Sequence, residues 1–368
     1  MKFICERQKI DDALAVVIGR TKNKQKIPVL AHVLLDVRPD AVEITATDLD
    51  AEIRATLPAD VSATGQVLVP ADHLYRLVKG FPVGGQVSVE ADDARATIKC
   101  GRSTYRLPTL PASDWPSMSE IVDGTEFTFK PGIVKRMFDL PQIAVSTDKA
   151  RQYLHGGYLH QSASGKVALV ATDAFLLVCV SADASFPLRD GKIIPRDAMA
   201  EIVKLSCEGM TFAVNANLIS VRGDTFRFTS KLVDATYPSY ERIIPDGAGS
   251  SLLVDRQDFA AALKRLALIG GDNPHLVFSW PGPGDKFSIS INGEGSGEEI
   301  VSGTVDMLRA GGIAFAPRYL LPPLDLFTGK TLRIVINDPN GAVRLIDDVA
   351  PDLTIVVMPV KHKEAQQS

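Results

Sequence analysis

The chain has 368 residues, of which 45% are hydrophobic and 23% charged, with a formal net charge of -4 at pH 7. This composition is typical of a folded globular protein and excludes a mainly disordered chain. No run approaches the about 18 apolar residues of a membrane span, and the charged stretch at residues 1–12 is unlike a signal peptide, so we expect a cytoplasmic protein with no membrane partner.

The chain contains the same pattern three times, at a spacing close to the size of a complete domain. The triplet Ala-Thr-Asp at residues 46–48 recurs at 171–173, an offset of 125. The segment Gly101–Met118 is matched by Arg222–Tyr240, with Gly223 standing to Gly101 at an offset of 122. Each copy opens with a strand-like run and an amphipathic helix, predicted within Phe3–Gly19, Phe127–Val145 and Leu252–Ile269.

Within the first copy, residues 33–58 alternate apolar and polar side chains and turn at residues 38–40 and 48–50. This pattern predicts a meander of antiparallel strands. A second helix is predicted from Pro70 to Gly80, because proline favours the start of a helix and glycine its end. Later copies have the same second helix after Pro195 and after Pro317, and the third is expected to be interrupted by Pro322 and Pro323.

Antiparallel sheet plus two helices, three times over, predicts an α+β protein of three similar domains. We place these domains at residues 1–122, 123–249 and 250–368. Lys and Arg side chains recur on the predicted helices at matching places in the copies. They are either ordinary solvated helix faces or parts of one basic surface, and such a surface would let an acidic protein hold DNA.

Sequence signatures of catalysis are missing. The chain has no GxSxG, no GxxxxGK[ST] and no metal-ligand spacing among its four cysteines and six histidines, which predicts neither a cofactor nor a metal site. The repeated Asp48 and Asp173 could be acids or metal ligands, but one carboxylate at a strand-to-turn junction fits an Asx turn better. An enzyme that has borrowed the fold stays open as an alternative, although no nucleophile is evident.

Two segments then become recognisable: Phe228–Pro245, which reads FTSKLVDATYPSYERIIP, and Val356–Pro359, which reads VVMP. With the repeated ATD triplet they resemble the bacterial DNA polymerase III β subunit, the sliding clamp, over essentially the whole chain. The resemblance implies the DNA clamp fold and a head-to-tail homodimeric ring whose helices line a central hole. It also implies a non-catalytic processivity factor that encircles double-stranded DNA without reading its sequence.

The resemblance further implies sets of site residues. Those expected near DNA are Lys24, Lys79, Lys149, Arg151, Tyr153, Arg196 and Lys204. Asp72 and Asp197 stand where the family more usually has Lys or Arg. They should weaken the positive charge of the surface that faces DNA. Those expected at the dimer interface are Tyr105, Leu268 and Ile269.

The family's second site is a hydrophobic pocket for short linear motifs of the polymerase III alpha subunit, the clamp loader and other clamp-binding proteins. Its residues here would be Leu154, Thr172, Ala174, Phe175, Leu176, Leu177, Pro238, Arg242, Ile243, Val356, Val357, Met358, Pro359 and Val360. We refer to this set as the partner pocket. Without the resemblance, the same residues could be ordinary core between the second and third domains.

The partner pocket departs from the family pattern at residues 174–176. The chain has Ala174, Phe175 and Leu176 where a Gly-His-Arg-like stretch is usual, and it adds a polar tail from Lys361 to Ser368. These departures favour a second hypothesis, a paralogous clamp or a mobile-element or resistance-type clamp with altered partner preference.

Overall fold

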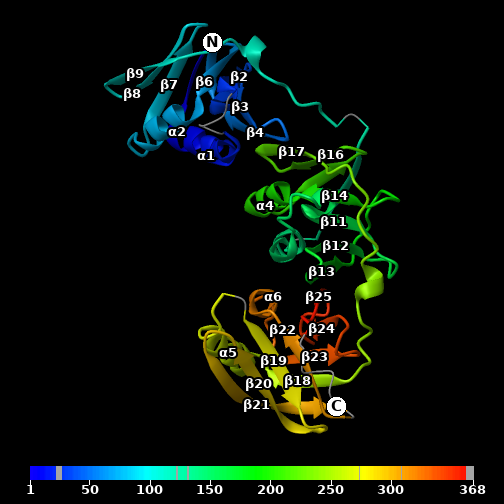
Figure 1. Cartoon of the computed structure of the whole chain (residues 1–368). Helices are drawn as coiled ribbons and strands as arrows, with labels where there is room; N and C mark the ends of the chain where they lie inside the picture. The colour runs from blue at the N-terminus through cyan, green and yellow to red at the C-terminus, as the bar shows by residue number, and fades with distance from the viewer. Residues whose placement is uncertain (22–26, 122, 131, 273, 308, 362–368) are drawn as a thin grey trace. The chain divides into compact units, whose positions relative to one another are not determined.

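The computed structural model describes residues 1–21, 27–121, 123–130, 132–272, 274–307 and 309–361 (Figure 1). Lys24 and most of the polar tail therefore lie outside the described residues. The chain forms two compact units, Met1–Pro131 with Lys204–Leu232, and Gly132–Val203 with Val233–Ser368. We describe each unit by itself.

The first unit contains two antiparallel sheets. The five-stranded sheet has the order β5 (Asp60–Ala63), β1 (Lys2–Glu6), β7 (Gln86–Ala91), β8 (Arg95–Cys100) and β9 (Ser103–Pro108). The eight-stranded sheet has the order β10 (Thr125–Thr128), β15 (Thr211–Val214), β16 (Leu218–Arg222), β17 (Phe226–Lys231), β4 (Ala51–Pro58), β3 (Ala41–Thr47), β2 (His32–Val37) and β6 (Gly65–Pro70).

Two helices cover these strands, α1 (Arg7–Val17) and α2 (Ala71–Lys79). Helix α1 packs on β3, β4 and α2, and buries Ile10, Leu14 and Val17, which recur at helical spacing. Both helices lie where the sequence pattern predicted them, since the apolar stripe is a local property of the sequence.

The second unit is built on one twelve-stranded antiparallel sheet. Its order is β14 (Lys192–Pro195), β11 (Gly156–Gln161), β12 (Val167–Thr172), β13 (Leu176–Ala182), β25 (Leu353–Val357), β24 (Val343–Ile346), β23 (Thr331–Ile336), β18 (Ser251–Asp255), β21 (Ser296–Asp306), β20 (Gly284–Asn292), β19 (His275–Trp280) and β22 (Gly311–Phe315). Its helices are α3 (Ile133–Asp139), α4 (Arg196–Lys204, ending at the boundary between units), α5 (Arg256–Ala267) and α6 (Pro317–Leu324).

Short 3-10 helices complete the described elements: η1 (Ile18–Arg20), η2 (Pro28–Ala31), η3 (Ala112–Asp114), η4 (Leu140–Ala144), η5 (Gln152–Leu154) and η6 (Glu241–Ile243). The described residues thus hold six α-helices, two for each copy of the repeat, which confirms the predicted α+β class.

The prediction that Pro322 and Pro323 interrupt α6 is wrong. The helix continues through both prolines to Leu324, although each lacks the N–H of an intrahelical bond. Leu320 and Leu324 are almost fully buried, and this packing offsets the lost hydrogen bonds.

The middle copy supplies strands to both large sheets. β17 pairs with β4 of the first copy, and β13 pairs with β25 of the third (Figure 1). The compact units therefore do not coincide with the sequence repeat, because strand pairing continues across the junctions between copies.

Candidate functional site

The repeated Thr-Asp motif forms the same turn in both copies. The Oδ1 atoms of Asp48 and Asp173 each accept two backbone N–H groups, two and three residues further on, at 2.8 to 3.1 Å. The next residue adopts a left-handed conformation in each, with φ of 77° at Leu49 and 80° at Ala174. The predicted Asx turn is confirmed, and it projects residues 49 and 174 from equivalent places.

The second of these turns leads into the residues predicted to form the partner pocket. β13 begins directly after it, and the pairing with β25 places Leu176 opposite Val357 and Leu177 opposite Val356. The N–H of Met358 then donates to the carbonyl of Phe175 at 2.8 Å. Leu176 and Val357, 181 positions apart in the sequence, are thus neighbours on adjacent strands.

The partner-pocket residues divide by burial. The buried ones are Leu154, Thr172, Leu176, Leu177, Val356 and Val357; the half-buried ones are Met358, Pro359 and Val360; the exposed ones are Ala174, Phe175, Pro238, Arg242 and Ile243. Leu154, Leu177 and Val356 share one apolar cluster with Tyr237 and Tyr240, which flank Pro238. The buried members are therefore core, as the alternative interpretation expected, while the others reach the surface.

Phe175 has an aromatic partner that sequence reasoning missed. Its ring stacks on Tyr319 of α6, with centroids 5.0 Å apart and planes inclined by 15°. The guanidinium of Arg318 lies 4.8 Å from the centre of the Tyr319 ring. The departure at residues 174–176 is thus part of a stack of three side chains, Phe175, Tyr319 and Arg318, which no local sequence pattern indicated.

A polar group of side chains lies under the same region. His160 Nε2 is 2.8 Å from the hydroxyl of buried Tyr240, and Tyr158 stacks on Tyr237. Burial raises the pKa of the Cys179 thiol to about 12. A thiol with such a pKa is not a nucleophile near neutral pH.

The DNA-binding candidates lie in both units. Lys79 is exposed in the last turn of α2, and Arg196 and Lys204 are the exposed first and last residues of α4. Exposed Lys149 and Tyr153 flank half-buried Arg151, whose guanidinium pairs with Asp148 at 3.3 Å. Asp72, expected to weaken the inner charge, pairs with Arg76 at 2.9 Å.

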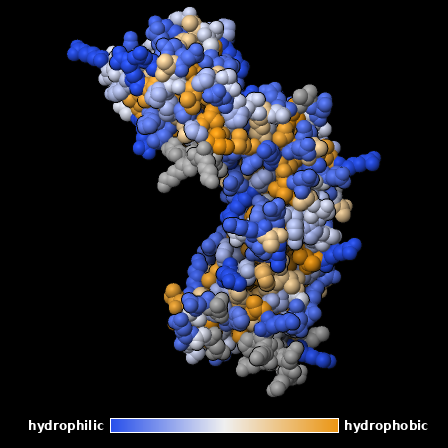
Figure 2. All heavy atoms as spheres, turned by 45° about the horizontal axis from the view of Figure 1, so that its top comes forward, coloured by the Kyte–Doolittle hydropathy of each residue, from blue (hydrophilic) through white to orange (hydrophobic). Residues whose placement is uncertain are grey.

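The three dimer-interface candidates are exposed apolar side chains. Tyr105 lies on β9, the edge of the five-stranded sheet, while Leu268, 85% exposed, and Ile269 follow α5. The face of the molecule in Figure 2 is mainly hydrophilic with scattered hydrophobic groups. Exposed apolar side chains such as these are typical of an interface, and the unpaired edge of β9 is open to pairing with another chain.

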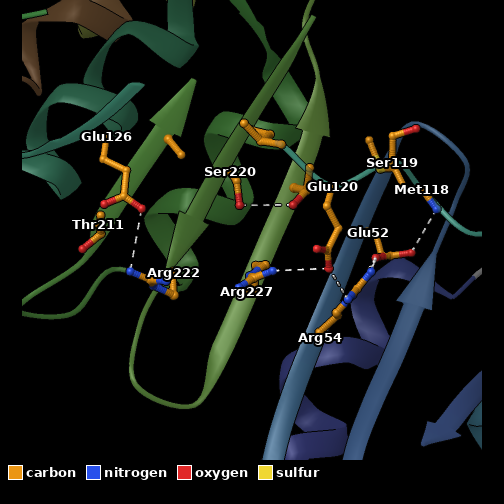
Figure 3. A pocket seen from close by; sticks show the side chains of 13 residues that line it. Glu52, Arg54, Met118, Ser119, Glu120, Glu126, Thr211, Ser220, Arg222 and Arg227 are labelled. Atoms are coloured by element: carbon orange, nitrogen blue, oxygen red, sulfur yellow. Dashed lines mark hydrogen bonds and ion pairs between the residues drawn. The ribbon is translucent and has the colours of Figure 1, made fainter. Parts of the chain in front are cut away.

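A charged cavity of about 260 Å³ lies in the first unit, where the segment after Trp115 crosses the eight-stranded sheet (Figure 3). Arg54 and Arg227 are directly opposite each other on β4 and β17. The Glu120 carboxylate bridges them, at 2.8 Å from Arg54 and 3.4 Å from Arg227. Figure 3 shows Arg222 and Glu126 on its other side, so ion pairs lie at both ends of the cavity.

Among the described residues, none of the helices is long and apolar enough to cross a membrane. The same part of the chain contains no group of three or more His, Cys, Asp and Glu side chains placed to hold a metal ion.

Three family models match the chain in succession. They describe the N-terminal, central and C-terminal domains of the DNA polymerase III beta subunit and match residues 1–119, 128–239 and 241–361. The beta sliding clamp of Caulobacter vibrioides is 31% identical and that of Escherichia coli 26%, each with 98% of this chain and all of the relative covered. A solved structure described as Caulobacter crescentus pol III beta aligns with a TM-score of 0.92 at 30% identity, covering 98% of this chain and 100% of that one.

Three antiparallel-sheet domains in succession, each with two helices, define a protein of the sliding-clamp class. The chain belongs to the DNA polymerase III beta subunit family. Its function is that of a sliding clamp for DNA polymerase.

Proposed function

We propose that this clamp closes as a head-to-tail homodimer around duplex DNA in the cytoplasm and tethers the replicative polymerase, without catalysing a reaction itself. The observation that carries the proposal is the match of all three domain models along one chain, in order. A ring holds DNA by topology, so it needs no base contacts and no reactive group. We place the domain boundaries at residues 1–122, 123–249 and 250–368.

The proposed DNA contacts are the cations of the helices and of the loop at residues 149–153. Exposed Lys and Arg side chains attract phosphates without reading sequence, and the attraction is screened and readily exchanged. Such contacts suit a protein that must slide. Asp72, by pairing with Arg76, removes one cation from that surface and should make DNA contact weaker.

The proposed partner site is the partner pocket, which would take a short motif of the polymerase alpha subunit, the clamp loader or other clamp-binding proteins. Its half-buried residues Met358 to Val360 and exposed Ile243 give apolar surface above a buried floor. Burying two or three apolar side chains at about 1.5 to 3 kcal/mol each, less the ordering costs, corresponds to roughly micromolar affinity. Weak binding lets partners exchange.

The experiment that tests the ring is sedimentation of the purified chain together with its retention on circular and linearised plasmid. A dimer that stays on circles, once loaded, and is lost from linear DNA supports a sliding ring. A monomer that leaves both equally fast contradicts it.

A second candidate is a clamp of this family with altered partner preference, and the stack of Phe175 on Tyr319 favours it. The Phe175 ring presents an apolar surface at the edge of the proposed partner pocket, where a His side chain would present a more polar one. Binding of a Gln-Leu-x-Leu-Phe peptide should then change severalfold in Phe175→His, measured by fluorescence anisotropy. Affinity equal to that of a typical clamp, unaltered by the substitution, would exclude this candidate.

A further inference from the structure

The first unit contains a second cavity, of about 570 Å³, beside the turn at Asp48. Its walls come from three places: the turn residues Thr47 and Leu49, the segment Pro116–Glu120, and the strands β16 and β17 with Lys231. We call it the first-junction cavity, because it lies where β4 of the first copy meets β17 of the second.

The first-junction cavity and the partner pocket are built from matching parts of the repeat. Thr47 and Leu49 stand 125 residues before Thr172 and Ala174, and Pro116 stands 122 residues before Pro238. In both turns the Thr hydroxyl donates to the carbonyl four residues on, at 2.9 Å for Thr47 and 2.8 Å for Thr172.

The closing strand is also equivalent at the two sites. At the first junction the N–H of Lys231 donates to the carbonyl of Asp50 at 2.9 Å, and at the second the N–H of Met358 donates to that of Phe175 at 2.8 Å. Ser230 pairs with Ala51 as Val357 pairs with Leu176. The same backbone construction therefore stands at each junction, and the side chains distinguish the two.

The first-junction cavity combines apolar and polar walls. Leu49, Met118 and Leu218 supply apolar surface, and Leu49 is 38% exposed. Asn217 and the serines of the Pro116–Glu120 segment add polar groups. Such a lining fits an extended peptide with one apolar side chain, since backbone amides and carbonyls need polar partners.

One cation of the first-junction cavity, Lys231, can meet a carboxylate of a bound peptide. Glu120 is already bridged to Arg54 and Arg227, so its charge is compensated. Lys231, where the partner pocket has Met358, pairs with Asp50 at 3.2 Å, and the side chains are 54% and 85% exposed. An exposed pair of this kind is worth about 0 to 1 kcal/mol, so Lys231 can turn from Asp50 to the carboxylate of a peptide at little cost.

We propose that the first-junction cavity is a second docking site, which takes a short extended segment of another protein carrying one apolar side chain and a neighbouring carboxylate. The inference rests on the proposed function of the partner pocket, whose construction it repeats. One clamp chain would then hold two partners with different side-chain preferences.

The probe is the acetylated, amidated pentapeptide Gln-Leu-Asp-Leu-Phe with photo-leucine in place of its first leucine, crosslinked to the full chain and mapped by mass spectrometry. Adducts are expected within residues 47–51 or 116–120 as well as in the partner pocket. Lys231→Glu and Leu49→Asn should each lower the first-junction adducts about fivefold. Asn tolerates the left-handed conformation at residue 49, so this variant should fold.

Ile243→Asn is the matched variant at the partner pocket, and should lower adducts there without changing those at the first junction. Adducts confined to the partner pocket, or first-junction adducts that neither Lys231→Glu nor Leu49→Asn reduces, would overturn the inference and leave the proposed function standing. Adducts at the first junction alone would uphold the inference and contradict the proposed partner pocket.

Discussion

At the scale of single residues, identical turns have different surroundings in the two copies. Asp48 caps its turn and also pairs with Arg20 at 3.4 Å, and both side chains are only 8% exposed. The Arg20 guanidinium lies 5.3 Å from the centre of the Phe228 ring. Arg20 therefore connects the first turn to β17, the strand of the second copy that pairs with β4. Asp173 makes the same backbone contacts at the turn that precedes Ala174 and Phe175, which are exposed.

We therefore expect Asp48→Ala to destabilise the protein much more than Asp173→Ala. Loss of the turn contacts should cost about 1 kcal/mol in each. Asp48→Ala also leaves Arg20 as a buried charge without this carboxylate, a change of roughly 3–5 kcal/mol. Urea unfolding of the two variants measures the difference, and equal midpoints would contradict the role of Arg20.

The cysteines should differ sharply in reactivity. Burial raises the pKa of Cys5 and of Cys179 to about 12, so at pH 8 roughly one thiol in ten thousand is ionised. Cys207 is exposed, and although burial raises its pKa too, reagent can reach it. Iodoacetamide at pH 8 should modify Cys207 in the folded chain and spare Cys5 and Cys179, as judged by peptide mass spectrometry. Equal labelling of all three would mean that the core opens readily.

At the scale of elements, arginines at the starts of helices hold later segments in place. Arg7, the first residue of α1, donates to the carbonyls of Val78 and Lys79 at the end of α2. Arg256, the first residue of α5, donates to the carbonyl of Gly329 beyond α6. The middle copy has Gly132 before α3 instead, and α3 is the shortest α-helix among the described residues.

At the junction of β4 and β17, Arg54 and Arg227 face each other and share the Glu120 carboxylate, while Arg54 also pairs with Glu52 at 2.8 Å. Like charges directly opposite on paired strands are destabilising. Glu120→Gln should therefore weaken the junction by up to about 1 kcal/mol, since Glu120 is partly exposed. Hydrogen exchange of the β17 amides should become about fivefold faster.

Glu126→Gln is the matched control for that measurement. Glu126 lies in the same cavity but pairs only loosely with Arg222, at 3.9 Å. It should leave β17 exchange unchanged. The same acceleration in both variants would mean that the cavity responds to charge in general, not to the bridge.

At the scale of the whole molecule, closing a ring requires two apolar surfaces of the chain to be covered by a second copy. The exposed Leu268 and Ile269 after α5 and Tyr105 on the β9 edge are suited to this role. Leu268→Asp should convert the dimer into a monomer in sedimentation velocity, because a buried unpaired charge is costly at an interface.

Val83→Asp controls for a general effect of charge at an exposed apolar residue, since Val83 is 87% exposed in the loop before β7. This variant should remain dimeric. A dimeric Leu268→Asp variant would contradict an interface at Leu268. A monomeric Val83→Asp variant would mean that the interface includes the loop at Val83.

Features that depend on neighbouring residues could be predicted from the sequence. The helices α1, α2 and α5 follow apolar spacing, and the turns at Asp48 and Asp173 follow from a side chain that bonds its own backbone. The two prolines of α6 misled the prediction because burial of Leu320 and Leu324, a tertiary effect, outweighed the local rule.

The sequence by itself determined that the chain is a threefold repeat of antiparallel sheet and paired helices, because periodicity and turn chemistry act within a few residues. Only the tertiary structure decided how the copies join: the pairing of β17 with β4 and of β13 with β25, the stacking of Phe175 on Tyr319, and the cavity at the first junction. These contacts join residues that are distant in the chain, and their partners are selected by packing and strand register, which no local pattern encodes.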